Sequence, residues 1–417
     1  MKVYKFGGAS VRSAEGVRNL RGIVGAADGP LFVIVSAMGK TTNALETVTE
    51  RFMTDDTAGA LDALSASRGY HEEICAGLFD GGRMPARVGE LFDGLRETLS
   101  AAKPGADDYD YWYDRIVSHG ELASTRIISE YLEASGVPNR WIDARKCLIT
   151  DSRHRDANVD LELSTPLLRK ETEGAKVFVS QGFIGADGQG ETTTLGREGS
   201  DYSAAVVANM LDAESLTIWK DVVGVMNGDP KIFPDAVYIP ELTYLDAVEL
   251  AYSGAQIIHP KTIKPLQNKD IPLYVRSFAD HTKPGSAIRA RMAGRIEVPI
   301  LILKHDQVLL SIRPNDFSFV LEDRFAAIFA MFERYNIKIN LIQSSAVNLS
   351  ICVDNSRRLS EVVGELTDSQ YRVVYNDDMQ LLTIRGYTPE LYEKYGSGEN
   401  IYLSQKTRRT LRVVRRK

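Results

Sequence analysis

Hydrophobic and polar positions alternate between two patterns at the start of the chain. Val3–Phe6 and Leu31–Val35 are short apolar runs, and the second is rich in β-branched residues. Between them, apolar residues such as Val17, Leu20 and Val24 recur at helical spacing. A strand, a helix and a second strand in this order predict a βαβ unit, and hence a parallel sheet.

The same alternation continues to about residue 300. Residues 43–135 are mostly helical in pattern. Further strands are expected at Arg140–Asp143, Lys176–Gln181, Ser215–Trp219 and Leu273–Val275, and helices at Ser203–Leu211 and Leu245–Tyr252. Asp187-Gly188, between strand-like residues, predicts a hairpin. We therefore expect residues 1–303 to form one α/β domain, with a mostly parallel sheet sandwiched by helices.

The pattern changes near residue 305. Strands are expected at Val308–Ile312, Lys338–Ile342, Leu349–Val353 and Tyr371–Tyr375, and helices at Arg324–Glu333 and Leu359–Leu366. This order, βαββαβ, predicts a ferredoxin-like module within residues 304–417. LLSIR at 309–313 recurs as LLTIR at 381–385, but Tyr387–Lys406 lacks a helix of similar length. A second module would therefore be shortened.

Composition narrows the function classes. The 417 residues include 50 basic and 56 acidic side chains, so the net charge of −6 does not favour nucleic-acid binding. The basic segment 408–417 is interleaved with apolar residues and is interpreted as a solvated terminal strand. Three cysteines and six histidines are scattered, which disfavours disulfides and side-chain metal ligation. Without a signal-peptide pattern or an apolar run of membrane-spanning length, we expect a cytoplasmic protein with no membrane partner.

Two glycine-containing loops follow the first two strands. In Lys5-Phe6-Gly7-Gly8, paired glycines let backbone N–H groups approach a phosphate, and Lys5 could neutralise it. An ordinary strand–helix turn is an equal alternative. The loop SAMGKTTN at 36–43 ends like a phosphate-binding Walker A loop, but Ile34 stands where its first glycine is required. It remains a candidate ligand loop at the end of a parallel strand.

A third motif, LGREGSD at 195–201, precedes a predicted helix. Arg197 could hold a carboxylate through two hydrogen bonds. Ser200 and Asp201 could also serve as ordinary helix caps, but a cap requires neither an arginine nor paired glycines. The loop that begins at Lys220-Asp221 is by itself better explained as a solvated turn. His119 has no nucleophile or acid at a confirming spacing, so a capping or core role is favoured.

Taken in order, these motifs resemble those of the aspartate kinases in the amino-acid kinase family. The matching stretches are KFGGASV at 5–11, SAMGKTTN at 36–43, SHGE at 118–121, QGFIG at 181–185, TTTLGREGSDYSAA at 192–205, WKDVVGV at 219–225, DPK at 229–231 and SGAQIIHP at 253–260. The segment after residue 304 resembles an ACT regulatory domain, most clearly at Glu322–Phe332 and Ile337–Asp354.

The resemblance implies the first step of lysine, threonine and methionine biosynthesis: MgATP phosphorylates the side-chain carboxylate of L-aspartate to give 4-phospho-L-aspartate and ADP. It assigns catalysis to Lys5 and Asp201. It assigns substrate binding to Thr42, Glu121, Arg197, Gly199 and Ser200. ATP binding is assigned to Lys5, Gly7, Gly8, Lys220, Asp221, Lys231, Gln256 and Ile257. Glu198, Lys220, Met226 and Gln256 depart from the commoner family pattern, mainly on the nucleotide side.

An aspartate side chain in water titrates near pH 4, so the carboxylate of the acceptor is ionised at neutral pH and requires no general base. Partners implied by the resemblance are L-aspartate, MgATP and an amino-acid effector, lysine or threonine, at the ACT region. An exposed ACT sheet edge favours a homodimer. Two alternatives stay open: another kinase of this fold, acting on acetylglutamate, glutamate or a nucleoside monophosphate, and a non-catalytic amino-acid sensor.

Overall fold

The computed structural model describes residues 1–105, 108–255, 258–292, 296, 298–316 and 322–416. The chain forms two compact units. The first comprises Met1–Val225, Tyr238–Val248 and Ile257–Gly294, and the second comprises Met226–Val237, Glu249–Gln256 and Arg295–Lys417. The predicted division at residues 303/304 falls inside a single strand, β14 (Ile300–Pro314). Among the described residues, no helix is long and apolar enough to cross a membrane.

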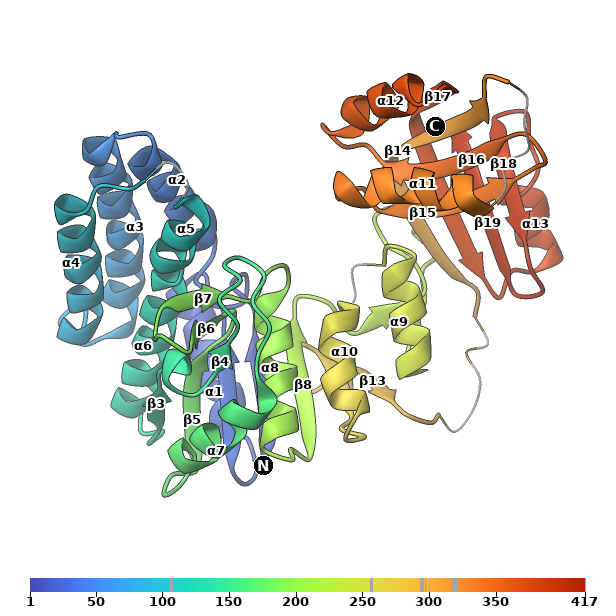
Figure 1. Ribbon diagram of the computed structural model, residues 1–417. Helices are drawn as coiled ribbons and strands as arrows, with labels where there is room; N and C mark the ends of the chain where they lie inside the picture. Colours follow the sequence, from blue (N-terminus) through green and yellow to red (C-terminus); the bar gives the residue numbers. More distant parts are fainter. Residues whose placement is uncertain (106–107, 256–257, 293–295, 297, 317–321, 417) are drawn as a thin grey trace. The chain divides into compact units, whose positions relative to one another are not determined.

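An eight-stranded sheet forms the centre of the first unit (Figure 1). Its strands, in spatial order, are β11 (Glu241–Thr243), β13 (Ser286–Arg289), β12 (Leu273–Ser277), β8 (Ser215–Lys220), β1 (Lys2–Phe6), β2 (Leu31–Val35), β5 (Val177–Gln181) and β3 (Arg140–Ile142). The pairs from β12 to β3 are all parallel, whereas β13 is antiparallel to β12 and parallel to β11. The predicted mostly parallel sheet is therefore confirmed.

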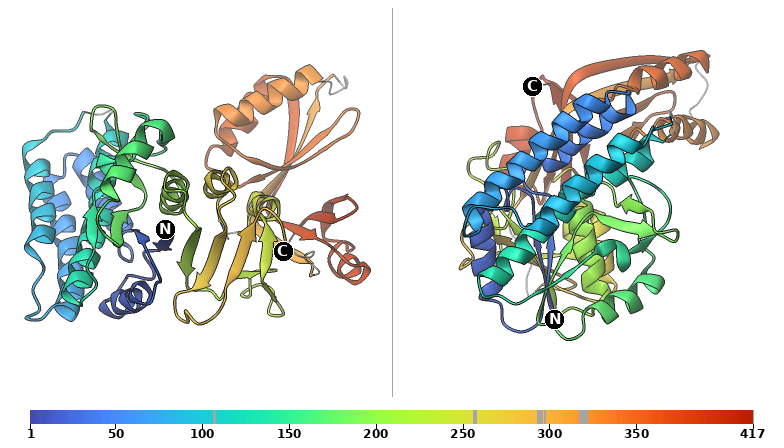
Figure 2. Two further views of the ribbon diagram at one scale, coloured as in Figure 1. Left: turned by 90° about the horizontal axis from the view of Figure 1, so that it is seen from below. Right: turned by 90° about the vertical axis from the view of Figure 1, so that its left-hand side faces the viewer.

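Helices cover both faces of this sheet. The helices of the first unit are α1 (Ala14–Gly25), α2 (Thr41–Met53), α3 (Thr57–Leu78), α4 (Ala86–Ala101), α5 (Tyr109–Val117), α6 (His119–Ala134), α7 (Leu161–Glu171), α8 (Gly199–Met210) and α10 (Pro260–Gln267), and α9 (Tyr244–Tyr252) begins in the first unit and ends in the second. Val33 and Val35 of β2 pack with Leu20 of α1 and Ile127 of α6. On the sheet, α8 contacts β1, β2 and β8, while the long helices α3 and α4 lie side by side (Figure 2).

Smaller elements complete the first unit. β4 (Ile149–Thr150), β6 (Ile184–Asp187) and β7 (Thr192–Thr194) form a three-stranded sheet, and β6 and β7 are the predicted hairpin. The short helix η1 (Ala144–Lys146) precedes β4. β9 (Val225–Met226) pairs with β10 (Tyr238–Ile239).

The second unit is built on a six-stranded sheet in the order β15-β16-β14-β17-β19-β18. The remaining elements are α11 (Glu322–Arg334), β15 (Ile339–Ser344), β16 (Leu349–Asp354), α12 (Leu359–Asp368), β17 (Tyr371–Arg385), α13 (Pro389–Tyr395), β18 (Ile401–Lys406) and β19 (Thr410–Arg416). The predicted βαββαβ order is confirmed from β14 to β17, with Ile328 of α11 and Val362 of α12 packed on Leu310 of β14.

The end of the chain differs from the solvated strand expected for it. β19 lies between β17 and β18, and Leu411, Val413 and Val414 are fully buried. The alternation of these residues with arginines places the apolar side chains in the sheet core and leaves only part of the strand to solvent. The shortened second module is confirmed in outline, because α13 has only seven residues.

Candidate active site

A cavity of about 430 Å³ lies in the first unit, where β1, β2 and β5 end. The carboxyl ends of parallel strands meet at one edge of a sheet, which is where ligands bind in folds of this class. Its walls are formed by Lys5, Ser36, Thr42, Tyr113, Glu121, Arg155, Phe183, Gly196, Arg197, Glu198, Gly199, Ser200 and Asp201. Every residue to which the resemblance assigns catalysis or acceptor binding therefore lines one cavity.

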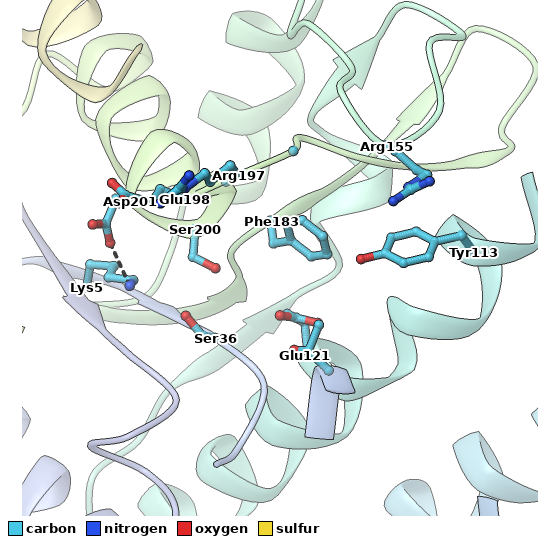
Figure 3. Close-up of a pocket in the computed structure, with 13 residues that line it drawn as sticks. Lys5, Ser36, Tyr113, Glu121, Arg155, Phe183, Arg197, Glu198, Ser200 and Asp201 are labelled. Carbon is cyan, nitrogen blue, oxygen red and sulfur yellow. Dashed lines mark ion pairs between the residues drawn. The ribbon is translucent and has the colours of Figure 1, made fainter. Parts of the chain in front are cut away.

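A buried ion pair forms one end of the cavity (Figure 3). The Lys5 Nζ atom lies 2.6 Å from Asp201 Oδ1, and Lys220 Nζ lies 3.9 Å from Asp201 Oδ2. Lys5 and Asp201 are 8% and 4% exposed. Burial alone would raise the pKa of the Asp201 carboxyl, but the two ammonium groups outweigh it and hold that pKa below its usual value. Asp201 is therefore an anion that fixes the Lys5 ammonium at the cavity wall.

The turn before α8 carries Arg197 to the cavity, and the first turn of α8 carries Ser200 and Asp201. Glu198 caps the helix with φ +55°, in the left-handed region that favours glycine. A Cβ atom on Gly199 would come within 2.7 Å of the Phe183 ring, so glycine is required there. The amino end of α8, with its positive partial charge, thus faces the cavity and favours an anion.

Glu121 of α6 contributes a carboxyl group without a full set of partners. It is 3% exposed, and its Oε1 atom accepts a hydrogen bond from the Ala37 N–H at 3.1 Å. Among the described residues, no group hydrogen-bonds to its buried Oε2 atom. Burial raises the pKa of this carboxyl to about 8. A cation that entered the cavity, such as an ammonium group, would satisfy Oε2 and restore the charge.

The opposite end of the cavity is formed by Tyr113 and Arg155, with Glu121 and Phe183 between the two ends (Figure 3). The Arg155 guanidinium carbon lies 4.6 Å from the centre of the Tyr113 ring. The sequence motifs did not point to either residue. One sequence signal lay nearby: Asp114, an acidic residue next to the aromatic residues Trp112 and Tyr113 of α5.

Asp114 holds the loop that carries Arg155. It is fully buried and accepts hydrogen bonds from the backbone N–H groups of Arg155 and Thr194 and from the Thr194 hydroxyl. His154 Nδ1 lies 2.9 Å from the same carboxylate. This bonding holds Arg155 in a left-handed conformation, with φ +65°, that a non-glycine residue rarely adopts.

His119 has a structural environment. Its Nδ1 atom lies 2.9 Å from the Arg115 carbonyl oxygen, and burial lowers the pKa of its imidazole to about 4, which agrees with a structural role.

The residues assigned to ATP binding are spread more widely. Gly8 packs so closely that a Cβ atom would lie 2.4 Å from the Ala37 oxygen. Asp221 is exposed just after β8. Lys231 belongs to the second unit, and Gln256 and Ile257 lie outside the described residues.

Known proteins resemble this chain in sequence and in fold. The model of the amino acid kinase family matches residues 1–277. Lysine-sensitive aspartokinase 3 of Escherichia coli is 30% identical over 96% of this chain and 90% of its own length. Aspartokinase 2 of Arabidopsis thaliana, a chloroplastic protein, is 32% identical over 87% of this chain and 69% of its own. The structure of Escherichia coli aspartokinase III with aspartate and ADP, in its R-state, aligns with a TM-score of 0.82 at 29% identity, covering 100% of this chain and 96% of that one.

The chain belongs to the amino acid kinase family. Within that family, the likeness over nearly its whole length places it among the aspartokinases, which are phosphotransferases. The structure with aspartate and ADP bound is that of a relative, and the assignment of individual residues in this chain is argued below.

Proposed function

We propose that this protein transfers the γ-phosphoryl group of MgATP to the side-chain carboxylate of L-aspartate. The observation that supports the proposal is one cavity that holds the Lys5–Asp201 pair, Arg197 and the buried Glu121 carboxyl. An amino acid with two carboxylates and one ammonium group matches this set of charges. The relative whose structure contains aspartate and ADP has the same fold.

Arg197 and Glu121 would recognise the two backbone-type groups of the acceptor. The Arg197 guanidinium can bind the α-carboxylate through two hydrogen bonds, with Thr42 and the amino end of α8 at Gly199 and Ser200 beside it. The ammonium group would meet the buried Oε2 atom of Glu121. The side-chain carboxylate of the acceptor is then directed towards Lys5. The Lys5 ammonium group must contact both this carboxylate and the γ-phosphoryl group of ATP.

The main obstacle to the reaction is electrostatic, because two anions must meet. Two unit charges 4 Å apart repel by about 4 kcal/mol at an effective dielectric constant of 20. Lys5, held by Asp201 and supported by Lys220, lies where it can offset this repulsion in the transition state. Since the aspartate carboxylate is ionised, no residue has to remove a proton from it.

The nucleotide is proposed to lie beside Lys5, along Gly7, Gly8, Lys220 and Asp221, with Lys231, Gln256 and Ile257 completing its site by resemblance. Mg²⁺ is expected to enter on the ATP phosphates. Among the described residues, no three or more His, Cys, Asp or Glu side chains are grouped to hold a metal ion of their own.

ADP production with a panel of acceptors tests the function. L-Aspartate should support turnover, and hydroxylamine should trap the acyl phosphate as a hydroxamate. L-Glutamate, N-acetyl-L-glutamate and uridine monophosphate should support little or none. A preference for one of the latter three would reassign the acceptor, and nucleotide binding without turnover on any of them would favour a sensor.

Regulation is a second part of the proposal. The Escherichia coli relative has also been solved with lysine and aspartate in its T-state, and that structure aligns with 99% of this chain, which includes a βαββαβ module. We infer that lysine inhibits this enzyme through that module, and that the edge strand β15 pairs with a second copy in a homodimer. ADP production with added lysine, threonine or methionine checks the first point, and sedimentation checks the second.

A further inference from the structure

A second cavity, of about 390 Å³, lies within the second unit and is lined largely by polar side chains. Its floor is one face of β17, β19 and β18, and its lid is the last turn of α9 with the residue that follows it. It is lined by Glu249, Leu250, Ser253, Ile302, Thr383, Arg385, Gln405, Thr407, Thr410 and Arg412. A volume of this size is in the range that small-molecule sites occupy.

The strand register aligns the floor in two rows. Thr383 of β17 is opposite Arg412 of β19, which is in turn opposite Gln405 of β18. In the next row, Arg385 is opposite Thr410. Side chains directly opposite each other on adjacent strands lie within contact distance on one face, so these donors form a single patch.

The neighbouring rows of the same strands are apolar, so the polar patch interrupts an otherwise apolar pattern. One step along the same face, Leu381 of β17, Val414 of β19 and Leu403 of β18 are buried in an apolar cluster. The other face of the same strands packs Leu382 and Val413 in a further apolar cluster. A face that served only for packing would continue the apolar pattern.

Two donors in the patch have no partner among the described residues. Thr383 is only 3% exposed, and within the described part of the chain no hydrogen bond uses its hydroxyl. Likewise, no ion pair or hydrogen bond there engages the Arg412 guanidinium. Thr383 and the half-buried Arg412 both line the cavity, so an acceptor that entered it would meet two donors that have no other partner in that part of the chain.

The charge of the cavity indicates the sign of the ligand. Arg385 Nη1 lies 2.5 Å from Glu249 Oε2, so one guanidinium is neutralised within the protein. Arg412 leaves one positive charge unbalanced, next to hydroxyl and amide donors. We propose that this cavity binds the oxyanion of a small metabolite, a carboxylate or a phosphate group, between Arg412, Thr383 and Thr410.

Hydrogen–deuterium exchange of the full-length protein, titrated separately with inorganic phosphate and with succinate, tests this site. Peptides that cover residues 245–255 and 403–412 should become protected saturably. Protection by phosphate alone identifies a phosphorylated metabolite, and protection by succinate alone identifies a carboxylate. Absence of protection with both probes would overturn the proposal.

Matched variants locate the binding. Arg412→Gln should weaken protection about tenfold or more, because it removes a charge-assisted hydrogen bond. Thr383→Val, which keeps the side-chain shape, should weaken it too. Arg408→Gln removes the same charge from the exposed end of the hairpin and should change nothing. Equal weakening in the Arg408 and Arg412 variants would show non-specific screening and refute the site. Hydrogen–deuterium exchange without ligand checks that each variant is folded. If Arg412→Gln does not fold, the protection measured for Thr383→Val decides whether the site exists.

Discussion

The buried Glu121 carboxyl predicts that acceptor binding depends on pH. Its pKa of about 8 means that the cavity holds a neutral acid at pH 7, whereas an ammonium group requires the carboxylate. Each pH unit below 8 therefore costs about a factor of ten in apparent affinity, or about fifty-fold between pH 8 and pH 6. At pH 7, binding of L-aspartate should release close to one proton.

Calorimetry measures both quantities. Titration of L-aspartate at pH 7 in two buffers with different ionisation enthalpies gives the number of protons released, and a series from pH 6 to pH 8.5 gives the affinity. Glu121→Gln should bind weakly, release no proton and show no pH dependence in this window. An affinity for the unmodified protein that is constant from pH 6 to pH 8 would refute the reasoning.

The same carboxyl predicts a change in stability. Because its pKa is raised in the folded state, the unfolded chain ionises first, near pH 4.5, and stability falls as the pH rises towards 8. Between pH 5.5 and pH 8 the loss is about 3 kcal/mol. Urea unfolding at several pH values should show that the free energy of unfolding falls with rising pH more steeply for the unmodified protein than for Glu121→Gln. Parallel pH profiles for the two proteins would contradict the prediction.

Four substitutions test other parts of the site. Lys5→Ala should lower kcat by about a thousandfold with little change in KM for aspartate, and near-normal turnover would remove Lys5 from the transition state. Arg197→Ala should mainly raise KM for aspartate, and a reduced kcat with an unchanged KM would reassign it. Asp114→Asn should lower the free energy of unfolding in urea by about 2 kcal/mol, because buried donors lose a charged acceptor; an unchanged midpoint would contradict this. Glu198→Gly should raise that free energy by about 1 kcal/mol by relieving the left-handed conformation, and destabilisation would show that the strain is absent.

Much of the first unit could be predicted because its central strands are buried on both faces. Leu31–Val35 is fully buried, and its continuous apolar run is the pattern that parallel strands require. β11 and β13 were missed, since three- and four-residue strands such as Glu241–Thr243 carry too few apolar residues to be recognised. Their pairing depends on the completed sheet.

The site was predictable where function is concentrated in a local motif. Lys5 and Asp201, 196 positions apart, were assigned from their own loops, and the fold brings them to 2.6 Å. Tyr113 and Arg155 were missed because neither belongs to a motif. Their position depends on Asp114, whose buried bonds with a distant loop cannot be read from neighbouring residues.

The way the chain is divided between the two compact units determines which fragments can fold by themselves. The polypeptide passes between the two compact units five times, and Met226–Val237 and Glu249–Gln256 each enter the second unit and return. Within that unit, the Asn227 carbonyl oxygen accepts a hydrogen bond from the Leu301 N–H. No single proteolytic cut releases an intact second unit, because Met226–Val237 and Glu249–Gln256 remain on the other fragment, and a ribosome must reach Arg295–Lys417 before the second unit can close its core. A cut between residues 294 and 295 should therefore leave a fragment that contains the whole first unit, whereas the second unit loses two of its three segments.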